Sequence, residues 1–205
     1  MKVPVGSHRA ITEGDDMDSV ALMKRVVAET EAIVDRIDPD QMGAATPCQQ
    51  WTVRDVVNHI TGGATMFAEC VEHGSVGDDR LAALTSGDNL GADYKAAFHT
   101  AADRAVASFD QPGALDKMVK LPFGEMPGGI ALNIAVFDVT THACDLAQAT
   151  GQRIEDEELL ETALAVGRQM IGPELRQPGL FDAEQEPPEG ASAAQRLLAF
   201  AGRPV

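Results

Sequence analysis

The sequence predicts an all-α protein, a bundle of four long helices with two shorter ones. Apolar residues recur at three- and four-residue spacing over several long segments, which is the period of a helix packed on one side. Clusters of Gly and Pro separate these segments, and only residues 115–121 alternate weakly, as a short extended segment would. Hydrophobic residues make up 44% of the 205-residue chain, which is enough to fill one core.

The first helix is expected over residues 18–37, and the run Asp38-Pro39-Asp40 ends it. The second helix is expected from the Thr52 cap to about residue 72. Its start is well marked, because Asp55 follows the cap by three residues and its carboxylate can reach back to it.

The second predicted helix carries two further local signals. Trp51 precedes the cap and can pack against Val56 as a hydrophobic staple. Gly62 and Gly63 weaken the helix by about 1 kcal/mol each relative to alanine. A polar, glycine-bearing stretch over residues 74–87 follows, and we assign no helix to it.

The remaining elements are bounded by apolar period and by Gly or Pro stops. We expect a third helix over residues 89–109, a turn-rich loop over 122–129, and a strongly apolar fourth helix over 129–150 that Gly151 stops. A shorter helix over 156–171, a surface loop over 177–190 and a terminal helix over 192–201 follow. The connections are too long and varied for a simple up-and-down series. We therefore expect one bundle domain over residues 17–205, with a tail from about residue 177, after a flexible N-terminal extension over residues 1–16.

Charge and cysteine content narrow the class of partner. The net charge is −16, from 16 basic and 32 acidic side chains. Such a chain repels phosphate backbones and anionic lipid, which argues against nucleic acid or a membrane as partner. No apolar run approaches the roughly 20 residues of a membrane helix. Three cysteines without a CxxC motif do not form a disulfide framework, so a reducing cytoplasm is the expected compartment.

Asp138 and His142 stand one turn apart on the fourth predicted helix. At 100° per residue they lie about 40° from each other, at the edge of the apolar face. A buried carboxylate without a partner costs several kcal/mol, so Asp138 needs the histidine, an arginine elsewhere or a metal ion. A carboxylate and an imidazole at this spacing can bind one ion together.

His59 is the natural third ligand. It lies on the flank of the second predicted helix, where it faces a neighbouring helix, and Gly62 and Gly63 are expected to leave room around it. Met66 and Cys70 lie beside it on the helical wheel and are candidates for lining a pocket, although packing in the core explains Cys70 equally well.

Structural alternatives accompany each of these residues. Asp138 and His142 can simply pair with each other inside the bundle. Asp145, one turn beyond His142, can orient that histidine through its second ring nitrogen, or it can meet solvent or cap a neighbouring helix. His73, at a helix end, and His99 are weaker candidates for metal ligation.

Three segments resemble actinobacterial DinB/YfiT-like metal-binding proteins. They are residues 45–60, 137–151 and 191–203, which read ATPCQQWTVRDVVNHI, FDVTTHACDLAQATG and ASAAQRLLAFAGR. The family is related to the N-terminal domain of mycothiol-dependent maleylpyruvate isomerase and includes thiol S-transferases. The resemblance implies a DinB/YfiT-like four-helix bundle with short additional helices, and a metal site at His59, Asp138 and His142.

Two departures from the family pattern concern the site. Asp138 stands where the isomerase has glutamate, so the reach of its carboxylate is shorter, and Cys144 replaces the usual aromatic residue before Asp145. The resemblance implies zinc as the metal, with nickel as the alternative. It also implies a low-molecular-weight thiol of the mycothiol type as co-substrate.

Two imidazoles and one carboxylate leave one coordination position open, which is the catalytic pattern for zinc. We therefore expect a metal-dependent thiol S-transferase or isomerase that acts on a small electrophile. Activation of water instead of a thiol, for hydrolysis, stays open, and so does a non-catalytic metal-binding or ligand-sensing module. A homodimer also stays open, since bundles of this type often pair through helix faces.

Overall fold

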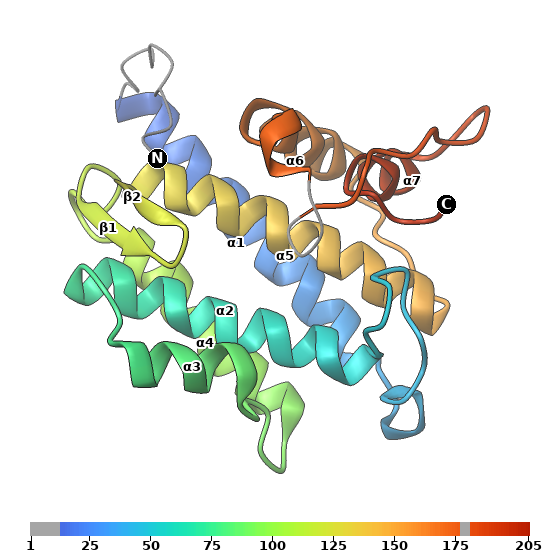
Figure 1. The fold of residues 1–205 in the computed structure, drawn as a ribbon, viewed down its shortest axis with the longest axis horizontal. Coiled ribbons are helices and arrows are strands. Elements are labelled where there is room, and N and C mark those ends of the chain that lie inside the picture. Colours follow the sequence, from blue (N-terminus) through green and yellow to red (C-terminus); the bar gives the residue numbers. More distant parts are fainter. Residues whose placement is uncertain (1–12, 177–180) are drawn as a thin grey trace.

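The computed structural model describes residues 13–176 and 181–205, which form a helical bundle (Figure 1). The described residues contain α1 (Glu13–Asp35), α2 (Val53–His73), α3 (Asp78–Ser86), α4 (Tyr94–Phe109), α5 (Gly128–Thr150), α6 (Glu157–Met170), α7 (Ala193–Phe200), two short 3-10 helices (Pro39–Gln41 and Pro173–Leu175) and a hairpin of β1 (Met118–Leu121) and β2 (Gly124–Pro127).

Four of the helices close into a ring around one core. α2 packs on α4 and α5, and α1 packs on α5 and α4. α6 and α7 pack on each other and cover the outer side of α5 (Figure 1). The all-α class and the four-helix bundle with short additional helices are therefore confirmed.

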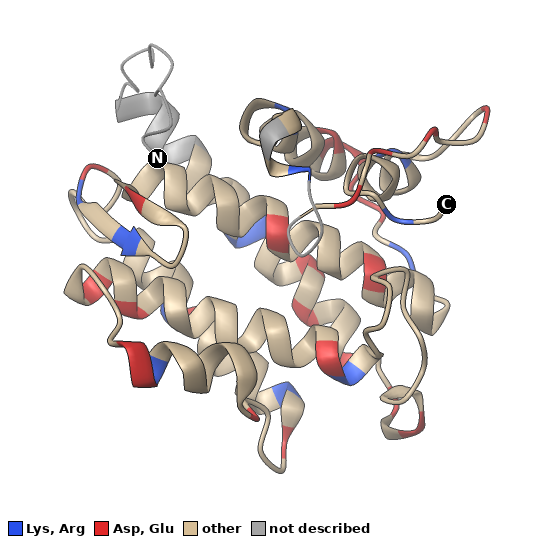
Figure 2. Ribbon diagram, in the orientation of Figure 1, with Lys and Arg blue, Asp and Glu red and all other residues tan. Residues whose placement is uncertain are grey.

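α5 is the central helix. Among the described residues it is the one helix long and apolar enough to suit a membrane span, but 78% of its apolar 18-residue stretch is buried inside the bundle. The sequence-based statement that no apolar run reaches such a length is thus too strict, and it is burial that argues against a span. Figure 2 shows most of α5 without charge, and its sequence holds two acidic residues, Asp138 and Asp145, and no Lys or Arg.

The start and end of α2 follow the predicted local chemistry. The Thr52 hydroxyl accepts a hydrogen bond from the backbone N–H of Asp55, and the Asp55 carboxylate accepts one from the backbone N–H of Thr52 at 2.8 Å. Gly74 ends the helix in the left-handed region with φ +86°. The capping box fixes the register of the helix, and therefore the direction in which His59 points.

Two helix boundaries differ from the prediction. α1 begins at Glu13 rather than residue 18, while residues 1–12 of the expected N-terminal extension lie outside the described residues. α4 begins at Tyr94 rather than residue 89, because the Asp93 side chain accepts a hydrogen bond from the backbone N–H of Ala96 and caps the helix there. A local capping residue thus overrides an apolar period that extends further back.

Besides the two 3-10 helices, two elements were missed. Residues 78–86, inside the polar stretch, form the short helix α3, in which Leu84 is the buried residue and which α2 supports along its length. Residues 124–127, inside the predicted turn-rich loop, form β2, which pairs with β1 so that Leu121 lies opposite Gly124. A nine-residue helix and a four-residue strand carry too little periodicity to be recognised, and tertiary contacts stabilise both.

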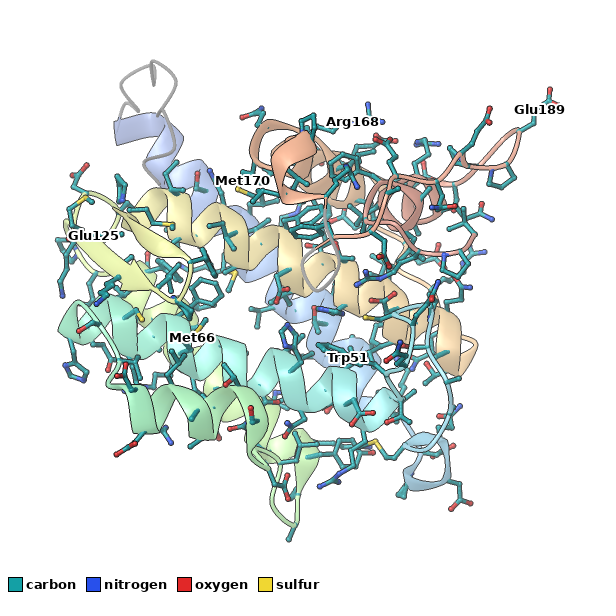
Figure 3. All side chains as sticks on the ribbon, in the orientation of Figure 1. Trp51, Met66, Glu125, Arg168, Met170 and Glu189 are labelled. Atoms are coloured by element: carbon teal, nitrogen blue, oxygen red, sulfur yellow. The ribbon has the colours of Figure 1, made fainter. Side chains whose placement is uncertain are left out.

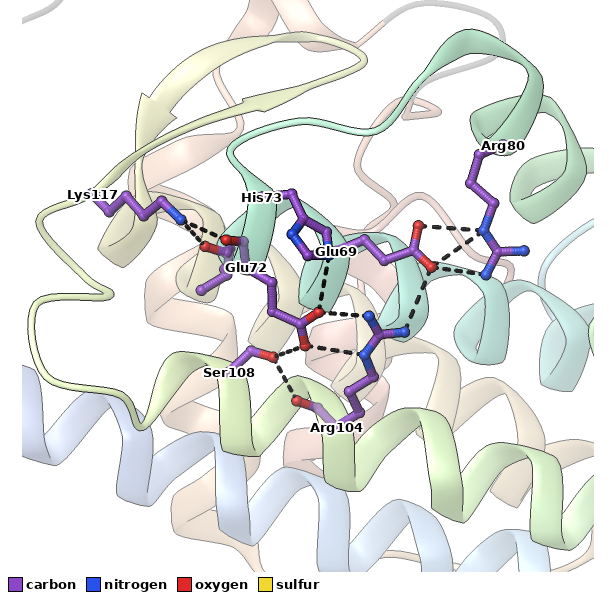
Figure 4. Close-up of polar contacts among 8 residues, drawn as sticks. Glu69, Glu72, His73, Arg80, Arg104, Ser108 and Lys117 are labelled. Carbon is purple, nitrogen blue, oxygen red and sulfur yellow. Dashed lines mark hydrogen bonds and ion pairs between the residues drawn. The ribbon is translucent and has the colours of Figure 1, made fainter.

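An ion-pair network ties the C-terminal half of α2 to its neighbours (Figure 4). Arg80 of α3 pairs with Glu69 at 2.8 Å, and Arg104 of α4 pairs with Glu72 at 2.6 Å. Lys117, just before β1, donates from Nζ to the carbonyl oxygen of Glu72 at 3.0 Å. Because the network joins α3, α4 and the segment before β1 to one end of α2, it helps to hold α2 at the end opposite to its capping box.

Gly62 and Gly63 provide a matched test of this packing. A Cβ at Gly62 would lie 2.2 Å from the carbonyl oxygen of Leu84 and 2.6 Å from Nδ2 of Asn89, whereas a Cβ at Gly63 meets nothing within 4 Å. Gly63→Ala should raise the free energy of unfolding by about 1 kcal/mol through helix propensity. Gly62→Ala should lower it by about 1–3 kcal/mol through overpacking. Urea unfolding measures both, and equal shifts would contradict the close approach of α3 to α2.

Candidate metal centre

Three predicted ligands meet where α2 packs on α5. His59 Nε2 lies 3.4 Å from Asp138 Oδ1, and His142 Nε2 lies 3.7 Å from the same oxygen. The three ligand atoms all lie within 4.8 Å of one another. Asp138 and His142 share a face because they are one turn apart, and the register set by the capping box of α2 brings His59 opposite to them.

The donor set and its spacing fit a divalent metal ion. Ligand atoms about 2.0–2.1 Å from a tetrahedral zinc lie roughly 3.3–3.4 Å from one another. The two separations that involve Asp138, 3.4 and 3.7 Å, are close to that edge length. Neutral imidazole and carboxylate are ligands that zinc accepts, and nickel accepts imidazole as well.

Asp145 fixes the orientation of His142. Its Oδ2 lies 3.0 Å from His142 Nδ1, and the Asp145 side chain is 0% exposed. An ionised carboxylate is an acceptor only, so Nδ1 is the donor in this contact, and Nε2 lies on the side of the ring toward Asp138. Of the alternatives for Asp145, contact with solvent is wrong, and the geometry favours orientation of the histidine.

The half-exposed side chains of His59 and Asp138 shift each other's pKa. Burial raises the pKa of Asp138, but the neighbouring His59 and His142 outweigh it and hold that pKa at about 2. Burial lowers the pKa of His59, but the Asp138 carboxylate outweighs it and raises that pKa above 6.5. A carboxylate that stays ionised beside two imidazoles is the charge arrangement that a divalent cation requires.

The site is open to solvent on one side. The side chains of His59 and Asp138 are 39% and 32% exposed, whereas His142 is 7% exposed. A ligand in solvent can therefore reach His59 and Asp138, whereas His142 is buried behind them.

Trp51 is a site residue that the sequence reading missed. Its ring centroid lies 4.8 Å from that of His59 and 5.5 Å from that of His142, on which it stacks at 17°. Figure 3 shows Trp51 beside the first turns of α2. From the sequence, Trp51 is expected only to pack against Val56. The signal that could have found it is that the chain's single tryptophan stands eight residues before His59 in the segment that resembles the family.

Arg203 and Cys48 were also missed. Arg203 Nη2 lies 3.3 Å from Asp145 Oδ2. Cys48, His142 and Asp145 form a second group whose ligand atoms lie within 4.8 Å of one another. Cys48 is half-buried rather than a fully buried packing residue, and burial raises the pKa of its thiol to about 11.

Met66 and Cys70 lie farther along α2. Both are buried, and the Cys70 thiol donates to the carbonyl oxygen of Lys120 in β1 at 3.3 Å. Figure 3 shows Met66 well along α2 from Trp51. The three-ligand group of the described residues includes neither of them. Gly62 does not leave room around His59 as expected, because it faces Leu84 and Asn89, whereas a Cβ at Gly63 would meet nothing within 4 Å.

The two weaker histidines lie in ion pairs elsewhere. His99 stands between Glu31 and Asp35 of α1, at 3.0 and 2.9 Å. His73, at the end of α2, lies 3.5 Å from Glu72. Neither belongs to a cluster of three metal-ligating groups among the described residues.

Residues 23–147 match the sequence model of the mycothiol maleylpyruvate isomerase N-terminal domain. The chain belongs to this family. The matched region holds His59, Asp138, His142 and Asp145, while Arg203 lies beyond it. Two uncharacterised proteins, from two strains of Mycobacterium tuberculosis, are 37% identical over 92% of this chain and 100% of their own length.

Solved structures of the family share the fold. A crystal structure of the mycothiol-dependent maleylpyruvate isomerase aligns with a TM-score of 0.60 and 16% identity, over 73% of this chain and 68% of that one. A crystal structure of a histidine-to-alanine mutant of that isomerase aligns with a TM-score of 0.60 and 15% identity over the same shares. At this identity the likeness concerns the helical fold.

The electrostatic coupling in the site can be measured without metal. In metal-free protein, Asp138→Asn removes the carboxylate and leaves the burial of the ring. We therefore expect the pKa of His59 to fall from above 6.5 to below it, as followed by NMR titration of the ring protons. Asp88→Asn is the control, because Asp88 pairs with Arg54 at the start of the same helix. An unchanged pKa of His59 in Asp138→Asn would contradict the contact.

Proposed function

We propose that this protein binds one divalent metal ion, zinc in the first place, through His59, Asp138 and His142. With the metal bound, it acts as a thiol-dependent S-transferase or isomerase on a small electrophile, and the thiol is of the mycothiol type. The observation that carries the proposal is the convergence of three ligand atoms within 4.8 Å of one another, two of them 3.4 and 3.7 Å from the same Asp138 oxygen, beside solvent-accessible side chains. Membership of a family named for a mycothiol isomerase supports the choice of thiol.

The residues present define what the metal would contribute. His59, Asp138 and His142 would hold a zinc ion with a fourth position open, and the bound ion would favour the thiolate form of a small thiol at neutral pH. Asp138 supplies the negative charge that favours the cation, since its pKa of about 2 keeps it ionised. Asp145 holds the Nδ1 side of His142 so that Nε2 faces the metal position.

The nucleophile in this proposal comes from a bound small molecule and not from the chain. Only a thiolate attacks an electrophile efficiently. Burial raises the pKa of Cys48 to about 11, and burial also raises the pKa of Cys70 and Cys144. All three cysteines are therefore thiols at neutral pH, and a separate low-molecular-weight thiol is needed.

Trp51 is suited to contact a substrate in the proposed site. Its ring stacks on His142 and tilts against His59, so it covers the imidazoles beside the open face. An aromatic wall of this kind gives a small electrophile an apolar surface close to the metal position. Small thiols of this class belong to a reducing compartment, so we place the protein in the cytoplasm.

Metal content and turnover test the proposal together. Protein purified without added metal should contain about one zinc per chain by elemental analysis, and His59→Ala should lose most of it, because two ligands hold zinc much less tightly than three. Conjugation of an electrophile to mycothiol, followed by mass spectrometry, should occur with zinc-loaded protein and stop after chelation. His73→Ala is the matched control, since His73 lies on the same helix but is 66% exposed and far along it.

Unchanged metal content in His59→Ala would sink the assignment of the ligands. Zinc at the proposed ligands without turnover of any thiol tested would instead favour the non-catalytic metal-binding or ligand-sensing module.

A further inference from the structure

The C-terminal segment places a guanidinium against the buried carboxylate of α5. Arg203 Nε lies 3.3 Å from Asp145 Oδ1, and Nη2 lies 3.3 Å from Oδ2, so both carboxylate oxygens accept hydrogen bonds from one side chain. The Arg203 side chain is 14% exposed and that of Asp145 is 0% exposed. This pair joins residues 58 positions apart in the chain, inside the protein.

Arg203 is itself held by the backbone around it. Its N–H donates to the carbonyl oxygen of Leu198 at 2.9 Å, and its Nη1 donates to that of Ala201 at 3.3 Å. Gly202 before it has φ +82°, and a Cβ there would lie 2.7 Å from Cβ of Asp182. The chain therefore leaves α7 in one tight, close-packed turn that aims Arg203 at α5.

A second arginine fastens the same segment without touching the site. Arg176 Nη1 donates to the carbonyl oxygens of Asp182 and Phe200, at 2.9 and 3.0 Å. Its guanidinium also lies over the Phe200 ring, 4.7 Å from the centroid. The segment after residue 181 is thus also held by contacts that do not involve Asp145.

We propose that Arg203 is a positioning residue of the metal centre, which holds Asp145 so that Asp145 holds His142. Asp145 Oδ2 accepts from His142 Nδ1 at 3.0 Å and from Arg203 Nη2 at 3.3 Å, while Oδ1 accepts from Arg203 Nε at 3.3 Å, so these contacts together restrict the orientation of the carboxylate. The orientation of the His142 ring, and hence the direction of Nε2, depends on that carboxylate. This inference rests on the proposed metal site and assigns a function to a residue outside residues 23–147, the stretch that the sequence model of the family matches.

Coupling between the metal and the C-terminal turn follows from this contact. If docking of Arg203 strengthens metal binding, then metal binding must strengthen docking of Arg203 by the same factor. The metal centre and the segment that follows α7 are therefore one energetic unit. Loss of the turn weakens the site even though the turn contributes no ligand.

Zinc affinity, measured by competition with a chromophoric chelator, tests the proposal. Arg203→Met removes the charge and keeps most of the side-chain volume. It should weaken zinc binding by roughly 10–100-fold, as loss of a hydrogen-bonding residue outside the ligand set typically does. Arg203→Lys should recover part of the affinity, because it restores the charge without the planar fork. The double variant with Asp145→Asn should bind no more weakly than Asp145→Asn alone, because both changes break one chain of contacts.

Arg196→Met is the matched control. Arg196 lies on α7 of the same segment, but it pairs with Glu161 of α6 and with the carbonyl oxygen of Ala191. It should keep wild-type zinc affinity. Hydrogen exchange of the unsubstituted protein adds a readout that needs no variant to fold: zinc should slow exchange of the amides of Ala201, Gly202 and Arg203.

The outcomes separate this inference from the proposed function. Wild-type affinity in Arg203→Met, with weakened binding in His59→Ala and Asp145→Asn, overturns the inference and leaves the metal site standing. Equal weakening in Arg203→Met and Arg196→Met also overturns it, because it reveals a general loss of packing. Zinc that leaves exchange at residues 201–203 unchanged contradicts the coupling. Absence of zinc binding at His59 in the unsubstituted protein overturns both proposals.

Discussion

A carboxylate with no exposure to solvent, on the most apolar helix of the bundle, is the constraint around which this end of the protein is arranged. Asp145 is 0% exposed, and a buried charge without partners costs several kcal/mol. Two side chains provide the partners that Asp145 needs: His142 on the same helix and Arg203 after α7. Arg203 thereby attaches the C-terminal segment to α5 close to the candidate site. The buried contacts of Asp145 lead through His142 to Asp138 and His59.

Local chemistry made much of the fold predictable. The cap of α2, the glycine stop of α5 at φ +69° and the spacing of Asp138 and His142 each depend on a few neighbouring residues, and each was expected from the sequence. α3 and β2 were missed because each is short and is stabilised by contacts with a neighbouring element, α2 for α3 and β1 for β2, rather than by its own periodicity. The start of α4 was misjudged because one capping aspartate outweighs a longer apolar period.

The candidate site divides in the same way. A helical wheel can bring together residues three or four apart, so Asp138, His142 and Asp145 were found as a group. A wheel cannot say what another helix or a tail presents to that group. His59 was proposed as a ligand from its flank position and from resemblance, whereas Trp51 and Arg203 went unassigned although both stand in the segments that carry the resemblance. Met66 and Cys70 were suggested from a wheel that is correct in angle, but they lie too far along the axis of α2.

Burial of the cysteine side chains, which is partial for Cys48, affects how they react with alkylating agents. Burial raises the pKa of Cys48, Cys70 and Cys144, and Cys48 lies within 4.8 Å of ligand atoms of His142 and Asp145. Alkylation proceeds through the thiolate, so cysteines whose sulfurs stay protonated react slowly with alkylating agents. The packing that buries these side chains therefore also lowers the reactivity of their sulfurs.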